Sequence, residues 1–167
     1  MLKALIPNSD KIPRIPTNLN FVMSSHQAEQ AQLLIDTFEM LGDWEERYRF
    51  LIDLGRDMPA MDDSDKVDAN KVSGCLSSVW ITADTNDNGG EQVVEFVADS
   101  DSAIVKGLIS MLRKVYSGQT PQAIVDFDVE DLFGKLGLGQ HLSVGRRNGL
   151  SEMVRRIKRL ATELAAA

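Results

Sequence analysis

Residues 79–97 read VWITADTNDNGGEQVVEFV, and two runs of β-forming residues flank a polar segment within them. The first run is Val79-Trp80-Ile81, and the second is Val93-Val94-Glu95-Phe96-Val97. The polar residues 84–90 are Asp, Thr, Asn and Gly. Asn, Asp and Gly favour turns because they tolerate left-handed backbone angles or bond to their own backbone. The stretch therefore predicts an antiparallel β-hairpin.

The polar segment also matches the spacing of a calcium-binding EF-hand loop. Asp84, Asn86 and Asn88 alternate along the chain, Gly89 follows them, and Glu95 lies at the last ligand position. An EF-hand loop joins two helices, whereas β-forming runs enter and leave this segment. We therefore interpret the segment as the turn of the hairpin and expect no metal site.

Apolar residues outside the hairpin recur at helical spacing and predict several amphipathic helices. The first expected helix runs from Gln27 to Leu41, and the second is capped by Asp43 with Glu46 and stopped by Gly55 and Met58-Pro59. A third is capped by Ser100 or Ser102 and ended by Gly118, and two short helices are opened by Thr120-Pro121 and by Asp128. The last helix carries apolar residues on one side: Leu150, Met153, Val154, Ile157, Leu160 and Leu164. We expect an α+β fold in which a small antiparallel β-sheet of about three strands packs against these helices.

The first 25 residues contain Pro7, Pro13 and Pro16 and show little periodicity. Proline interrupts helices and central strands, so we expect an extended or poorly ordered lead-in over residues 1–25. The remaining residues, 26–167, have the length of one domain with a sizeable core, since 43% of the chain is hydrophobic.

Composition and charge argue against several classes of function. No apolar run approaches the roughly 18 residues of a membrane span, so we expect no membrane partner. Residues 1–23 lack the charged start and apolar core of a signal peptide, which predicts a cytoplasmic protein, with an organelle stroma as the other compatible compartment. The net charge of −7 repels phosphate backbones and argues against nucleic acid. Basic residues crowd one C-terminal segment, which we interpret as a solvated helix face: Arg146, Arg147, Arg155, Arg156, Lys158 and Arg159.

Cys75 is the only cysteine in the chain. The polar residues 62–70 precede it, Gly74 adjoins it and the first β-forming run follows, so we expect the cysteine at the tip of a loop. One cysteine excludes an intramolecular disulfide, a four-cysteine zinc site and a CxxC redox pair. Walker, dinucleotide, HExxH and nucleophile-elbow motifs are also absent. The thiol is therefore the strongest candidate for chemistry.

Two other interpretations of Cys75 remain open from the residues alone. A free cysteine often behaves as a small buried hydrophobe, which would make the protein an interaction module with a structural cysteine. Alternatively, His141 could be the base of a thiol-dependent hydrolase, which requires its ring within hydrogen-bond reach of the sulfur. The sequence does not supply that distance.

The residues around Cys75 resemble the cysteine signature of the SufE family of sulfur-acceptor proteins. The matching pattern is Val72-x-Gly74-Cys75-x-Ser77-x-Val79-Trp80. Two further blocks resemble the family in the same order: residues 99–108 (DSDSAIVKGL) with Thr120-Pro121, and residues 138–150, which contain Gln140-His141-Leu142 and Arg146-x-Asn148-Gly149-Leu150. The resemblance spans roughly residues 33–160.

The chain departs from the family pattern directly after His141-Leu142. Ser143-Val144 stands there in place of the family's usual Thr-Pro pair. The register from His141 and the register from Asn148-Gly149 both assign the family's arginine position to Arg146, with Arg147 as the alternative.

The resemblance implies a sulfur carrier and desulfurase activator rather than an enzyme. Cys75 would accept sulfur from the persulfide of a pyridoxal-phosphate-dependent cysteine desulfurase and pass it to an iron–sulfur cluster scaffold complex. The resemblance also implies a SufE-like fold, partner contacts by Gly74, Leu76, Asp101 and Arg146, and shelter of the resting thiol by Leu76 and nearby apolar side chains. We expect no cofactor on this chain, because pyridoxal phosphate belongs to the desulfurase, and we expect a monomer or weak homodimer.

Overall fold

Strands β1 (Val79–Asn88) and β2 (Glu91–Ser100) pair in antiparallel register along their whole length. Gly89 and Gly90 form the turn, with φ angles of 67° and 91°. Glycine adopts positive φ without steric cost, and two such residues in succession produce a turn that fits the twist of a hairpin. The predicted hairpin is confirmed. Its strands are longer than expected, because residues 84–88 continue β1 and the two glycines alone reverse the chain.

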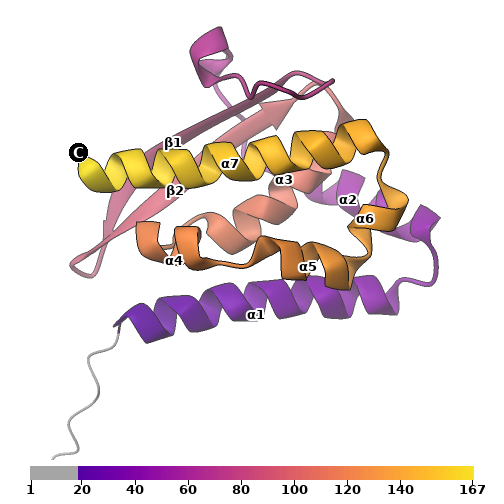
Figure 1. Cartoon of the computed structure of the whole chain (residues 1–167), viewed down its shortest axis with the longest axis horizontal. Coiled ribbons are helices and arrows are strands. Elements are labelled where there is room, and N and C mark those ends of the chain that lie inside the picture. The colour runs from indigo at the N-terminus through magenta and orange to yellow at the C-terminus, as the bar shows by residue number, and fades with distance from the viewer. Residues whose placement is uncertain (1–18) are drawn as a thin grey trace, which may run out of the picture.

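A computed structural model describes residues 19–167 of the chain, and their side chains from Ser25 onward (Figure 1). The remaining elements are α1 (Leu19–Met40), α2 (Trp44–Arg56), two 3₁₀ turns (Asp63–Asp65 and Asp68–Asn70), α3 (Ala103–Tyr116), α4 (Pro121–Asp126), α5 (Val129–Leu136), α6 (Leu138–His141) and α7 (Val144–Ala166). Over this range no helix combines the length and apolarity that a membrane crossing requires.

The sheet has two strands over residues 19–167, rather than the expected three or so. Two other segments reach the hairpin, but each forms only a single isolated bridge: Lys71 with Trp80, and Gln119 with Val94. Both segments turn away within a residue or two, toward the Cys75 loop and toward α4, and are too short to extend the sheet. The α+β class itself is confirmed.

Helix α1 begins at Leu19, eight residues before the expected start at Gln27. The prediction of an extended lead-in is therefore wrong for residues 19–25, while residues 1–18 lie outside the described range. All three prolines of the lead-in precede Leu19, so no proline interrupts α1. Gln27 is buried, and its Nε2 donates to the carbonyl oxygens of Val115 (2.9 Å) and Ala123 (3.3 Å), which ties α1 to α3 and α4.

The predicted helix caps are confirmed at four helices. In each case the cap side chain accepts a hydrogen bond from the backbone N–H three residues later: Asp43 from Glu46 (2.9 Å), Ser102 from Val105 (3.4 Å), Thr120 from Ala123 (3.2 Å) and Asp128 from Asp131 (3.1 Å). Of the two serines proposed for α3, Ser102 is the cap. Such a bond satisfies a backbone donor that the helix leaves unpaired, so each cap marks its helix start in the sequence.

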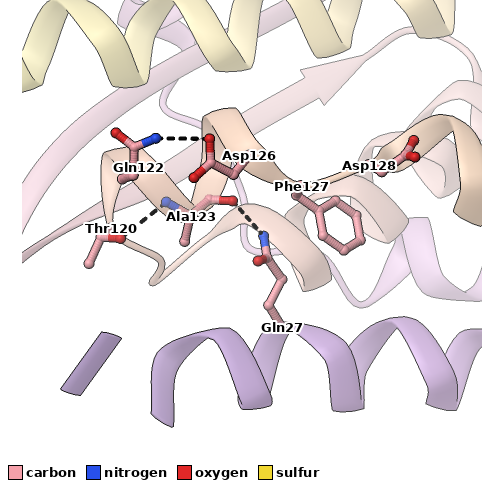
Figure 2. A pocket seen from close by; sticks show the side chains of 7 residues that line it. All are labelled: Gln27, Thr120, Gln122, Ala123, Asp126, Phe127 and Asp128. Carbon is pink, nitrogen blue, oxygen red and sulfur yellow. Dashed lines mark hydrogen bonds between the residues drawn. The ribbon is translucent and has the colours of Figure 1, made fainter. Parts of the chain in front are cut away.

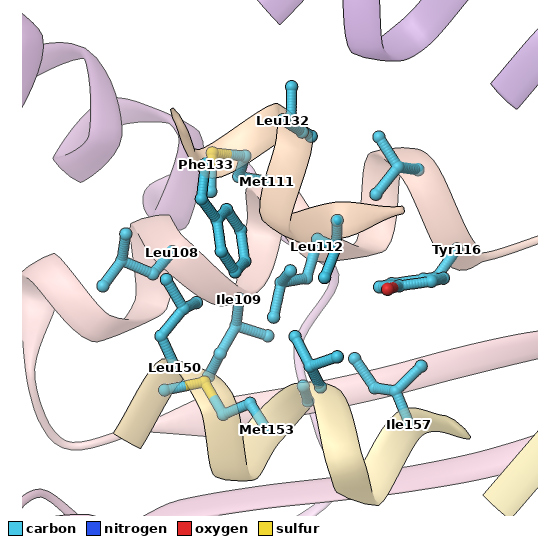
Figure 3. Close-up of a cluster of buried hydrophobic side chains, with 14 of the residues drawn as sticks. Leu108, Ile109, Met111, Leu112, Tyr116, Leu132, Phe133, Leu150, Met153 and Ile157 are labelled. Carbon is cyan, nitrogen blue, oxygen red and sulfur yellow. The ribbon is translucent and has the colours of Figure 1, made fainter. Parts of the chain in front are cut away.

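Helix α3 lies at the centre of the molecule. Its buried residues, among them Leu108, Ile109 and Leu112, face α5 on one side and α7 on the other (Figure 3). Residues of α5 and α7 complete this cluster: Leu132, Phe133, Leu150, Met153 and Ile157. These two helices therefore sandwich α3, and the packing fixes the position of α7.

Two glycines allow α2 and α3 to cross at backbone contact. A methyl group added at Gly107 would lie 2.1 Å from the carbonyl oxygen of Leu51, and one added at Gly55 would lie 2.8 Å from the backbone nitrogen of Gly107. No side chain fits at either position. Gly55 is thus a packing residue inside α2 and not the helix stop that its local sequence suggests.

Substituting Gly107 by Ala should destabilise the fold by about 2 kcal/mol or more, because the new methyl group overlaps a backbone atom that cannot move independently. Gly134→Ala is the matched control. Gly134 lies within α5 and has nothing within 4 Å of an added methyl group, so alanine there should be neutral or stabilising by up to about 1 kcal/mol. Urea unfolding of both variants measures the difference, and equal stabilities would contradict the described crossing.

Candidate functional site

The Cys75 loop, residues 71–78, is anchored at both ends. At its start, the Val72 N–H donates to the Val79 carbonyl oxygen (2.8 Å). At its end, the Ser78 N–H donates to Asp101 Oδ1 (3.1 Å), and the Asp101 N–H donates back to the Ser78 carbonyl oxygen (3.3 Å). Ser100 Oγ donates to the same carbonyl oxygen (2.8 Å). Asp101 therefore holds the loop against the end of β2.

An ion cluster fixes the segment before the loop. Asp99 accepts from Lys66 Nζ (2.9 Å) and from Lys106 Nζ (3.2 Å), so one carboxylate joins the 3₁₀ region to α3. Burial alone would raise the pKa of Asp99, but hydrogen bonds from Lys66, the Ser100 backbone and Lys106 outweigh it and lower the pKa. The Asp99 side chain is only 16% exposed, so these contacts are shielded from water.

Gly74 gives the loop its sharp turn toward α7. Its φ angle is +85°, a conformation that side chains disfavour, and a methyl group there would lie 3.0 Å from Glu152 Cγ on α7. The turn brings Cys75, which is half-buried, against the N-terminal half of the same helix. A glycine at this position therefore allows both the backbone angle and the close approach.

Cys75 and Leu76 rest on two glycines one helical turn apart on α7, which we call the glycine seat (Gly145 and Gly149). A methyl group at Gly149 would lie 3.3 Å from Cys75 Sγ, and one at Gly145 would lie 2.5 Å from Leu76 Cδ1. The Cys75 thiol donates to the Gly149 carbonyl oxygen at 3.5 Å. The seat thus lets the sulfur reach the helix backbone.

A cavity of about 20 Å³ adjoins the thiol. Its wall includes Cys75, Leu76, Arg146 and Met153. Such a volume holds about one small atom or one water molecule. Leu76 lines the cavity but remains 90% exposed, so Val105, Met153 and the backbone of α7 supply most of the shelter.

The environment of Cys75 favours the neutral thiol. Burial raises the pKa of the thiol, and the nearby Glu152 carboxylate raises it further. The hydrogen bond to the Gly149 carbonyl also requires the proton to stay on sulfur. An ordinary free thiol is only about 3% ionised at pH 7, so this cysteine is less ionised than that in the free protein.

The structure distinguishes the two arginines that the sequence left as alternatives. Arg146 is exposed and lines the cavity beside Cys75. Arg147 instead donates through Nη1 to the Gly139 carbonyl oxygen (2.7 Å) on α6. Ser143 caps α7 by accepting from the Arg146 N–H (3.3 Å), so the Ser143-Val144 pair begins the helix and keeps Arg146 beside the thiol.

His141 occupies a packing position. Its ring stacks on Trp44 with centroids 3.9 Å apart, and Nδ1 lies 3.1 Å from the Gly137 carbonyl oxygen. Tyr48 donates its hydroxyl to the His141 carbonyl oxygen. Over residues 19–167 no hydrogen bond joins His141 to Cys75, and the histidine is not part of the wall around the thiol. The geometry does not support the catalytic pair of the hydrolase alternative.

A larger cavity, of about 380 Å³, lies between α1 and α4 (Figure 2). Its polar side chains bond within its wall, as Gln27 does to the Ala123 carbonyl oxygen and Gln122 to Asp126 (2.8 Å). It contains neither the cysteine nor a histidine. Size alone therefore does not make it a reactive site.

Three residues that shape the site were assigned no role in it from the sequence: Gly145, Gly149 and Glu152. The two glycines are separated by three residues, the spacing that places them on one helix face, and this spacing is visible in the sequence. Nothing in the sequence indicated that the Cys75 loop rests on that face. In the sequence Glu152 looks like an ordinary surface charge, and only the structure places it beside Gly74.

Comparisons with known proteins agree on one family. Residues 32–161 match the family described as "SufE: Fe-S metabolism associated domain". An uncharacterized SufE-like protein of Rhizobium meliloti is 41% identical over 125 residues, which cover 75% of this chain and 89% of that protein. Another, of Rhizobium etli, is 40% identical over 134 residues, which cover 80% of this chain and 90% of that one.

A solved structure has the same fold. The solution structure of a hypothetical protein from Thermus thermophilus aligns with a TM-score of 0.64 at 20% identity, and the alignment covers 83% of this chain and 97% of that one. At this identity the likeness concerns the fold alone.

Replacing Glu152 by Gln should lower the pKa of Cys75, because it removes a negative charge that disfavours the thiolate. The pH at which alkylation by iodoacetamide reaches half its maximal rate should lie above the ordinary value of about 8.5 in the wild type and shift downward in the variant. Glu163→Gln, near the end of the same helix, is the control and should leave the midpoint unchanged. A Glu152→Gln profile that superimposes on the wild type would contradict the described electrostatics.

Proposed function

This chain belongs to the SufE family, whose domain is associated with Fe–S metabolism, and from that membership we propose that Cys75 accepts sulfur from a cysteine desulfurase. The donor would be the persulfide on the cysteine of that pyridoxal-phosphate enzyme. The chain would then deliver the sulfur to an iron–sulfur cluster scaffold. It would itself bind no cofactor and act as a carrier and activator.

The observation that carries this proposal is a lone thiol at a loop tip, seated on α7 beside a cavity of about one atom. A carrier needs a nucleophile that another protein can reach and a place where the carried sulfur is shielded from water and oxidants. The half-buried Cys75 on its anchored loop meets the first need, and the small cavity meets the second.

The transfer is a thiol–persulfide exchange. The Cys75 thiolate attacks the terminal sulfur of the donor persulfide, and the sulfur–sulfur bond of the donor breaks. The donor cysteine leaves as a thiolate, and Cys75 becomes a persulfide. The proton lost from Cys75 balances the one that the donor thiolate takes up. No oxidant is consumed, because the sulfane sulfur passes between two thiols of the same oxidation level.

The absence of a second cysteine suits this role. A neighbouring thiol in the same chain could attack the Cys75 persulfide, form a disulfide and release sulfide. Cys75 is the only cysteine of the sequence, so its cargo can leave only to a thiol or another acceptor from outside.

The raised pKa of Cys75 makes reactivity depend on the partner. In the free protein burial, Glu152 and the Gly149 carbonyl all favour the protonated thiol. A docked desulfurase that draws the loop tip off the glycine seat would remove these influences together. The thiolate would then form where a persulfide is within reach.

Four residues are proposed to meet the partner around the thiol. Leu76 offers an exposed apolar side chain, and Arg146 offers an exposed charge at the edge of the cavity. Gly74 would contribute backbone at the sharp turn. Asp101 already binds the Ser78 N–H, so its part in docking would include holding the loop end fixed while the tip moves.

The proposal predicts that the wild-type protein raises the rate of alanine formation from L-cysteine by a cognate desulfurase several-fold, because Cys75 clears the persulfide after each turnover. Cys75→Ser should abolish the stimulation. His141→Ala, once shown by thermal unfolding to be folded, should retain it. Stimulation by Cys75→Ser equal to that of the wild type would overturn the proposal, and activity on small thioesters that depends on both Cys75 and His141 would favour the hydrolase alternative.

A further inference from the structure

A groove of about 200 Å³ runs beside the Cys75 loop, between residues 71–73 and α7, and we call it the basic groove. Its wall consists of Lys71, Val72, Ser73, Glu152, Arg155, Arg156 and Arg159. Four cationic side chains and one carboxylate thus line a single concave surface.

One of the four cations is held rigidly. Arg156 donates through Nε and Nη2 to the Ile81 carbonyl oxygen (3.1 and 3.0 Å) and through Nη2 to the Ala69 carbonyl oxygen (3.3 Å). These acceptors are neutral, so the positive charge of Arg156 is fixed in place and not neutralised. Its position also ties α7 to both sides of the groove.

The other cations are only partly neutralised. Arg155 pairs with Glu152, and Arg159 lies 3.8 Å from Glu163 in an exposed pair of the kind that contributes little. Lys71 has no ion pair with any residue in the range 19–167. The groove and its ion pairs therefore contain four cations and only two carboxylates, Glu152 and Glu163, which makes this region positively charged in a chain whose net charge is −7.

The clustered charges repel one another in the free protein. Burial lowers the pKa of Arg156, and the nearby Arg159 charge lowers it further, while the Glu163 carboxylate opposes both effects in part. Holding like charges together costs free energy that a bound anion recovers. The Arg155 and Arg159 side chains are 74% and 61% exposed, so water screens part of this repulsion. The concave surface that the four cations share is nevertheless suited to a negatively charged ligand.

The groove adjoins the reactive thiol. Ser73 in its wall is two residues from Cys75, and Glu152 in its wall is close enough to Cys75 to raise the pKa of the thiol. A protein that covers Cys75 for sulfur transfer therefore also reaches the groove. The negative net charge of the chain disfavours nucleic acid as the occupant.

We propose that the basic groove binds an acidic segment that the desulfurase presents beside its persulfide-bearing cysteine. This inference rests on the proposed function and names the docking surface for its first step. The donor is the favoured occupant because the groove adjoins the thiol that meets the persulfide, and a loop tip that moves during transfer is poorly suited to supply the docking affinity. A preformed charged groove can supply it, and it also steers the encounter.

The test compares two charge-reversed proteins with equal net charge. The groove variant carries Lys71→Glu and Arg159→Glu, which spare the structural contacts of Arg156. The control carries Arg49→Glu and Lys135→Glu, on α2 and α5, where both cations are exposed and paired with neighbours on their own helices. The half-saturating concentration of each protein for stimulation of the desulfurase is measured at low and at physiological salt.

The groove variant should need about tenfold more protein for half-saturation at low salt, and the gap should narrow as salt is added, while the rate at saturation stays at the wild-type value. The control pair should shift the half-saturating concentration less than about twofold. Equal shifts in both proteins would mean a general charge effect and would overturn the groove as docking surface, as would no shift in either.

Two further outcomes separate the groove from the proposed function. If the groove variant is loaded normally by the desulfurase but discharges slowly to a scaffold protein, the occupant is the acceptor and the assignment to the donor is wrong. If the wild type itself neither stimulates the desulfurase nor receives sulfur at any concentration, the proposed function fails and the inference fails with it. Normal wild-type transfer with an unaffected groove variant refutes the inference alone.

Discussion

The contact between the Cys75 thiol and the backbone of α7 determines how this site works. It exists because Gly145 and Gly149 leave bare backbone where any other residue would place a side chain. The thiol reaches the Gly149 carbonyl, is half-buried and keeps its proton. A thiol with such a resting state is protected from oxidation, and in the proposed carrier role its reactivity would depend on the protein that displaces the loop.

The rest of the fold supplies the rigid supports for that contact. Helix α3 packs between α5 and α7, and its crossing with α2 relies on the bare backbone at Gly107. The hairpin ends where Asp101 binds the loop, and Asp99 joins the preceding segment to α3 through two lysines. The tip, Cys75 and Leu76, is held mainly by its contact with the glycine seat, so motion can be confined to these two residues, which would take part in the proposed transfer.

Short-range sequence signals predicted those features of the structure that depend on residues close together in the chain. Caps such as Asp43 and Ser102, the hairpin and the loop position of Cys75 all depend on residues within a few positions of one another, and the structure has them. Contacts between distant segments were not predictable in this way. The glycine seat brings together residues about seventy positions apart. Gly55 was expected to end α2 because the sequence does not show that it packs against Gly107 in α3. The length of β1 was missed because two glycines suffice for the turn.

The most direct test of Cys75 as a sulfur carrier is the intact mass of the protein after incubation with a cysteine desulfurase, pyridoxal phosphate and L-cysteine. We expect added mass of about one sulfur atom, located on the peptide that contains Cys75, removed by a thiol reductant and absent from Cys75→Ser. An unmodified protein after incubation with a desulfurase that forms its own persulfide would contradict the carrier role, as would an adduct that persists in Cys75→Ser.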